Sequence, residues 1–175
     1  IKLYKIGNSD AAVKFEVVEK PNDWVKEIKK DTSNNPTKQF RYDYWVAFNS
    51  YAFANTQFSK NFNQRKASTD HWMDLSIGSS DCHIAVSQIK KRNALDVEIY
   101  IHEDKNLFAN LYAHKDVIEN EIGFALEWKE LPEKKASRII IEKAVDLANK
   151  DMWNQQFEWI MDTCLKMKKA FKKYL

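Results

Sequence analysis

Residues 69–86, TDHWMDLSIGSSDCHIAV, combine acids, histidines and a tryptophan, which are residue types that could form the catalytic edge of an enzyme. Carboxylates can hold a divalent metal ion, and histidines can transfer protons. Here, however, Met73 and Leu75 alternate with Trp72 and Asp74, and alternation with period two predicts a half-buried strand. We therefore interpret the stretch as one strand of a sheet with a polar outer face.

Other chemical motifs are missing from the sequence. His71 and His83 lie on different predicted strands, and neither has a partner at zinc-site spacing. The chain contains no G-x-S-x-G motif and no glycine-rich phosphate loop. We expect neither a cofactor nor a metal ion under the preferred interpretation.

Two more strands, CHIAVSQI and ALDVEIYIH, follow across short polar turns, which indicates an antiparallel meander packed on one side. In the third strand four apolar residues alternate with polar or aromatic ones. The apolar set is Leu95, Val97, Ile99 and Ile101, and the other set is Asp96, Glu98, Tyr100 and His102.

Helical periodicity flanks these strands. It predicts helices over about residues 38–59, 103–123 and 150–174, with Gly123 as a C-cap, and FALEWKEL and ASRIIIEKAV read as further strands. The predicted fold class is α/β of the α+β type. A mostly antiparallel sheet is covered by helices in the order α-β-β-β-α-β, followed by β-α.

The first predicted helix carries more aromatic residues than a single apolar stripe needs. Tyr42 and Trp45 lie off that stripe, so they are buried either inside the domain or against a partner. Together with Trp72 they form the candidate interaction face.

The N-terminal residues 1–31 read as a hairpin plus a short helix, or as the tail of a preceding domain. Ile1 already lies in a strand-like run, so we expect that the chain was cut from a longer protein. Residues 38–175 are expected to form a single α/β domain.

Composition fits one packed domain, with 44% hydrophobic residues and a formal net charge of +3. No apolar run reaches the roughly 18 residues of a membrane span, so no membrane partner is expected. Cys82 and Cys164 are isolated and read as buried thiols, which favours a cytoplasmic location.

One enzymatic alternative remains open. The predicted order helix, three strands, helix, strand occurs in restriction-endonuclease-like nucleases, where acids and an acid-x-Lys pair hold Mg²⁺. Asp74 and Glu98 could supply the carboxylates, but DVEIYI lacks the lysine. Lys90 is then the nearest candidate in sequence to replace it.

Basic turns offer a different function, because lysines in loops contact phosphates without reading base sequence. The candidates for contact with duplex DNA, if these are not ordinary solvated turns, lie at two predicted turns, the first containing Lys90, Lys91 and Arg92, and the second containing Lys134, Lys135 and Arg138.

Four segments, HWMDLSIG, VEIYI, FALEWKELPEKKASRI and QFEWIMD, resemble in this order a bacterial domain, the domain-of-unknown-function family 4268. The similarity covers about residues 38–175. The resemblance implies a domain that follows a restriction-endonuclease-like region in the same chain, and it implies no catalytic residues. The preferred function is a non-catalytic accessory module of a nuclease-like protein that contributes DNA contact or assembly, including homo-oligomers. The alternative is a divergent metal-dependent nuclease.

Overall fold

The computed structural model describes residues 2–4, 12–14 and 35–175 of the chain. Strands β1 (Lys2–Tyr4) and β2 (Ala12–Lys14) pair antiparallel, with Lys2 opposite Lys14. This pairing lies within residues 1–31, which were predicted to be either an N-terminal hairpin with a short helix or the tail of a preceding domain. The short helix predicted after Pro21 lies outside the described residues.

The main sheet has five strands in the order β3-β4-β5-β7-β6, and every neighbouring pair is antiparallel. The predicted fold class is confirmed. The strands are β3 (Trp72–Leu75), β4 (Cys82–Ile89), β5 (Ala94–Ile101), β6 (Glu127–Lys129) and β7 (Ser137–Ala144).

A tight turn joins β4 to β5 through the 3-10 helix Lys90–Arg92. Asn93 ends it with a φ of 47°, a left-handed conformation that asparagine tolerates better than most residues. This turn fixes the register in which β5 returns along β4.

The first two predicted long helices are each divided in two. Asn55 ends α2 (Pro36–Ala54), and its side chain accepts hydrogen bonds from the backbone of Gln57 and Phe58 to start α3 (Thr56–Asn61). Asparagine at an N-cap satisfies N–H groups that a new helix leaves free. His114 likewise separates α4 (Lys105–Ala113) from α5 (Lys115–Ile122).

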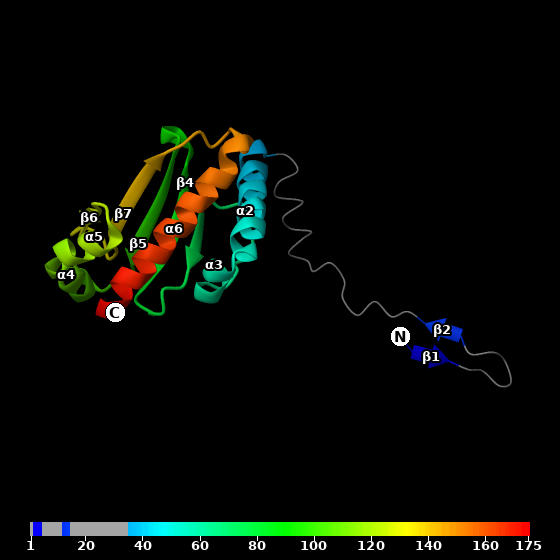
Figure 1. The fold of residues 1–175 in the computed structure, drawn as a ribbon, viewed down its shortest axis with the longest axis horizontal. Coiled ribbons are helices and arrows are strands. Elements are labelled where there is room, and N and C mark those ends of the chain that lie inside the picture. The colour runs from blue at the N-terminus through cyan, green and yellow to red at the C-terminus, as the bar shows by residue number, and fades with distance from the viewer. Residues whose placement is uncertain (1, 5–11, 15–34) are drawn as a thin grey trace.

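Gly123 caps α5 with a φ of 88°, as predicted, and α6 (Trp153–Phe171) is the last α-helix. Figure 1 shows α6 lying across the sheet, with α2 and α3 on the β3 side and α4 and α5 near β6. None of these helices is long and apolar enough to cross a bilayer, among the residues that the structure describes.

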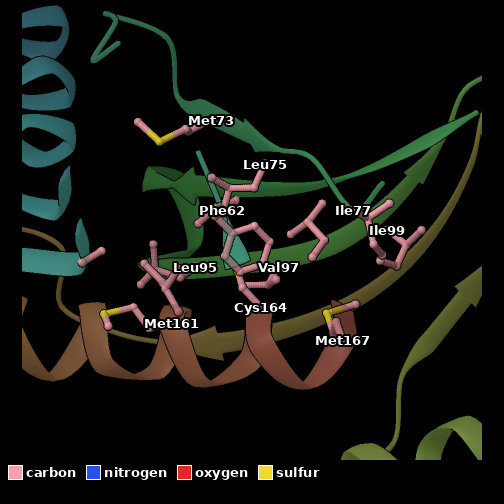
Figure 2. Packing of buried hydrophobic residues seen from close by; sticks show 14 of the residues in the cluster. Phe62, Met73, Leu75, Ile77, Leu95, Val97, Ile99, Met161, Cys164 and Met167 are labelled. Atoms are coloured by element: carbon pink, nitrogen blue, oxygen red, sulfur yellow. The ribbon is translucent and has the colours of Figure 1, made fainter. Parts of the chain in front are cut away.

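The core lies between α6 and one face of the sheet. Met161, Cys164 and Met167 point from α6 toward the side chains of β3 and β5, including Leu95 and Val97 (Figure 2). Cys82 and Cys164 are both free and buried, as expected. The apolar half of each alternating strand therefore forms the floor of the core.

Of the two aromatic residues predicted off the apolar stripe of α2, Trp45 is packed inside the domain, together with stripe residues, whereas Tyr42 is only half-buried. Tyr44, Trp45 and Phe48 are fully buried, and the Tyr44 ring makes edge contacts with Trp153 and Phe157 of α6. The Tyr44 hydroxyl donates a 3.0 Å hydrogen bond to Gln156. Burial within the domain therefore accounts for Tyr44, Trp45 and Phe48.

The opposite face of the sheet carries the other half of each alternating strand, and we call it the open face. By register it comprises Trp72, Asp74, His83, Ala85, Ser87, Asp96, Glu98, Tyr100, Arg138, Ile140 and Glu142.

Candidate binding cleft on the open face

A cleft of about 460 Å³ opens on this face above the central strands. Strand register explains its composition, because Tyr100 on β5 lies opposite both His83 on β4 and Arg138 on β7. Glu98 lies opposite Ala85, whose small side chain leaves space above the sheet. The full lining is His71, Trp72, His83, Ala85, Ser87, Glu98, Tyr100, His102 and Arg138.

Glu98 forms the charged floor of the cleft and is only 2% exposed. Burial raises its pKa, although the nearby Arg138 opposes the shift by stabilising the carboxylate. Arg138 Nη2 donates a 2.9 Å hydrogen bond to Glu98 Oε1, and the guanidinium lies 5.7 Å from the Tyr100 ring centre. Arg138 Nε is buried and has no hydrogen-bond partner among the described residues. The floor of the cleft therefore contains a buried ion pair in which one guanidinium N–H is left without a partner in the described part of the chain.

Two histidines form one side of the cleft. His83 Nδ1 lies 3.2 Å from His102 Nε2, and the His83 ring stacks on Tyr100 with ring centres 5.3 Å apart. Burial lowers the pKa of His83, and the neighbouring His102 lowers it further. Its burial beside a second imidazole therefore disfavours the charged form of His83.

Trp72 stands at the rim and is 43% exposed. It also lines a second hollow, of about 450 Å³, where Arg65 forms an ion pair with Asp74. The second hollow is lined by Gln64, Arg65, Lys66, Ser68, Asp70, Trp72, Met73 and Asp74.

A third hollow, of about 380 Å³, continues onto α2, where Tyr42 and the exposed Val46 line it. It shares Gln64, Arg65 and Lys66 with the second hollow. The three hollows thus lie next to one another in a series from Tyr42 to Arg138, which we call the track.

A separate cluster of charges surrounds Asp96 farther along the open face. Burial raises the pKa of Asp96 to about 6, and the nearby Glu142 adds to the shift. Arg92 lies 3.7 Å from the Asp96 carboxylate and also pairs with Glu142. One Asp96 oxygen is buried without a hydrogen-bond partner among the described residues.

The family model described as Domain of unknown function (DUF4268) matches residues 40–175. The chain belongs to the DUF4268 family. No curated protein and no solved structure matches it. The match begins in α2 and runs through α6, so the whole track lies within the DUF4268 domain.

The DUF4268 sheet does not bring the candidate nuclease residues together. Asp74 on β3 and Glu98 on β5 both lie opposite Ala85 on the strand between them. Two strand spacings therefore separate their Cα atoms, which corresponds to roughly 10 Å. Each carboxylate is held by its own arginine, Arg65 or Arg138. Within the described ranges no three His, Cys, Asp or Glu side chains form a group that could hold a metal ion.

Lys90 lies far from these acids. It follows Ala85 by five residues, which along a strand corresponds to roughly 16 Å, and it occupies the turn at the end of the sheet. The position of Lys90 is therefore unsuited to replace the missing lysine of an acid-x-Lys pair.

The predicted DNA-contact residues do not form one patch either. The turn with Lys90, Lys91 and Arg92 and the turn with Lys134 and Lys135 lie at opposite ends of β5, roughly 25 Å apart. Arg92 and Arg138 are ion-paired on the open face, and Lys135 pairs with Glu103.

The three residues of the candidate interaction face do not lie together on the surface. Tyr42 and Trp72 both line the track, whereas Trp45 is fully buried and donates its indole N–H to the Asp70 carbonyl at 2.9 Å. Trp45 is therefore a core residue. Sequence reasoning did not select Arg65, Lys66, His102 or Tyr100, although the alternation of β5 already placed Tyr100 and His102 on the polar face.

Proposed function

We propose that this DUF4268 domain is a non-catalytic nucleic-acid-contact module that holds a single strand of DNA along the track. The observation that carries this proposal is the alternation of aromatic and cationic side chains along three neighbouring hollows. From α2 to β7 these are Tyr42, then Arg65 and Lys66, then Trp72, then Tyr100 with Arg138.

This arrangement suits an unpaired strand for a physical reason. Bases stack on aromatic rings with about 1–3 kcal/mol per base, and cations beside them follow the phosphates. Trp72 exposes a large ring between two hollows, and a base stacked on it can reach into the cleft. Bases in a duplex are already stacked and paired, so they cannot enter.

The electrostatic part of binding should be modest. Arg65 and Arg138 each pair with a carboxylate, Asp74 and Glu98, so the track is not strongly basic. Because each neutralised phosphate contributes to the salt dependence of binding, we expect a shallow salt slope. Lys90 and Lys91 remain available at the sheet end for duplex flanking the single strand.

The module would act within a longer protein. The family resemblance implies a nuclease-like region before this domain, and a strand held on the track would be positioned for that region. Cleavage would then take place in the preceding nuclease-like region, and this domain would hold the substrate strand.

Fluorescence anisotropy with a labelled single strand of about 12 nucleotides tests the proposal, since single-strand sites span roughly 4–16 nucleotides. We expect Trp72→Ala to weaken binding roughly tenfold, as the loss of one stacked base predicts. Tyr112→Ala is the matched control, because Tyr112 is an exposed aromatic on α4 that lies off the track. It should leave affinity within a factor of two.

Three outcomes would overturn the proposal. Tighter binding of duplex, reduced by changes at Lys90 and Lys91 but not at Trp72, would place the contact on the basic turn. A concentration-dependent dimer without nucleic-acid affinity would indicate an assembly module. Metal-dependent plasmid nicking that is lost in an Asp74→Ala, Glu98→Ala double variant would make the domain a nuclease.

A further inference from the structure

One oxygen of the Glu98 carboxylate accepts no hydrogen bond from the residues that the structure describes. Glu98 lines the cleft, although its side chain is only 3% exposed. Arg138 Nη2 donates to Glu98 Oε1, and no described donor reaches the second oxygen, Oε2. A carboxylate accepts hydrogen bonds and cannot donate them, so a ligand that brings N–H groups to Glu98 is favoured.

The strand register leaves open space beside this carboxylate. Ala85 lies directly opposite Glu98 on the neighbouring strand, and its side chain ends at Cβ. His83 and Ser87 lie two residues before and after Ala85 on the same face of β4, and all three line the cleft. Because opposite residues stand about 4.5–5.5 Å apart, a flat group above Ala85 lies with one edge toward Glu98.

Arg138 adds hydrogen-bond donors to the same part of the cleft. Its guanidinium carries several N–H groups and no acceptor, and its side chain is 42% exposed. The 2.9 Å hydrogen bond between Arg138 and Glu98 holds the guanidinium and the carboxylate side by side. The pair therefore suits a ligand edge on which donors lie next to an acceptor.

Guanine carries this pattern on its Watson–Crick edge, where N1–H and the N2 amino group donate beside the acceptor O6. Adenine and cytosine offer one amino group without a second donor beside it. Thymine has a carbonyl on each side of its single N–H, and these oxygens repel a carboxylate.

We propose that the cleft selects an unpaired guanine, with Glu98 accepting from N1–H and the N2 amino group and Arg138 donating to O6. The inference rests on the proposed single-strand contact and names the base that this contact prefers. The cleft volume of about 460 Å³ lies within the range of roughly 300–1,000 Å³ that is typical of small-ligand sites. In a duplex the same edge of guanine is already paired, so only an unpaired base can enter.

Titration of the full chain with dGMP, dAMP, dCMP and dTMP tests the assignment without a strand. The ring ¹H–¹³C signals of His83 and His102 report occupation of the cleft, because both residues line it. The His114 ring, which packs on Tyr174 outside the cleft, should not shift. We expect the Kd of dGMP to be about tenfold lower than that of each other mononucleotide, as one base-reading pair predicts.

Glu98→Gln should abolish this preference, because an amide offers one acceptor oxygen where the carboxylate offers two. Glu142→Gln is the matched control, because Glu142 is also paired with an arginine on the open face but lies outside the cleft. The control variant should keep the preference for dGMP of the wild type.

The comparison among mononucleotides uses the wild type, so it does not depend on a variant that fails to fold. Equal binding of all of them, a preference for another base, or no shift of the cleft signals at saturating dGMP would overturn the assignment. An unchanged preference in Glu98→Gln would also overturn it. Selection of dGMP without any single-strand binding in the anisotropy experiment would overturn the proposed function and not the base assignment.

Discussion

Arg138 on β7 donates a 2.9 Å hydrogen bond to Glu98 on β5, and the side chain of Glu98 is 3% exposed whereas that of Arg138 is 42% exposed. The pair lies diagonally across the sheet, since Arg138 is opposite Tyr100 and Glu98 is opposite Ile140. The charged floor of the cleft thus depends on an arginine that water reaches and a carboxylate that water does not.

Arg138→Met should destabilise the domain, because it leaves Glu98 buried and unpaired. Breaking a fully buried ion pair costs about 3–5 kcal/mol. Because Arg138 is partly exposed, we expect the free energy of unfolding to fall by only about 1–3 kcal/mol. Urea denaturation at neutral pH measures this. The adjacent Tyr100 ring also loses its cation contact.

The double variant Glu98→Gln, Arg138→Met isolates the cause. A neutral amide removes the buried charge, so stability should recover at least half of the loss. Lys135→Met is the control, because Lys135 and Glu103 are both well exposed and should contribute little. Equal losses in the single and double variants would contradict an electrostatic origin.

The raised pKa of Asp96 predicts a specific pH dependence. The folded state holds the Asp96 proton until about pH 6, whereas the unfolded chain releases it near its ordinary value. The free energy of unfolding therefore falls as pH rises from about 4 through 6, by on the order of 2 kcal/mol.

Asp96→Asn should remove this fall. The stability of the variant relative to wild type should rise between about pH 4 and pH 7. Asp162→Asn serves as control, because Asp162 pairs with Lys166 on the exposed side of α6. Parallel stability curves for wild type and Asp96→Asn would contradict the assigned shift.

Truncation to alanine should lower the free energy of unfolding strongly at Trp45 and only slightly at Trp72. Trp45→Ala empties a fully buried site and removes an indole hydrogen bond, so about 3–5 kcal/mol of stability should be lost. Trp72→Ala removes an exposed ring and should change stability by about 0.5 kcal/mol or less. Thermal and urea unfolding compare them, and a large loss in Trp72→Ala would show that this ring supports the fold.

The fold was predictable because its main signals are local. Period-two alternation in β3 and β5 identified both faces of the sheet, and Gly123 marked the end of α5. The break at Asn55 was missed because the aromatic pattern of α2 continues into α3 at Phe58. Asn55 itself was the available signal, because asparagine is a preferred residue at the start of a helix.

The candidate site was less predictable because it depends on register and distant packing. Tyr100 meets Arg138 only because β7, rather than β6, lies beside β5. The burial of Trp45 involves the irregular segment before β3, where the Asp70 carbonyl accepts the indole N–H, and no periodicity within α2 indicates this contact. Arg65 lies in an irregular segment before β3, where no periodicity indicates which way a side chain points.

Photo-cross-linking tests the central claim, that a single strand lies on the track, most directly. A single strand of about 12 nucleotides carrying 5-iodouracil is irradiated with the full chain, and the linked residues are identified by mass spectrometry. The account predicts cross-links to Trp72 and to Tyr42 or Tyr100, with none to Tyr112. Cross-links confined to the turns at residues 90–92 and 134–135, or no cross-link at a concentration that saturates binding, would contradict it.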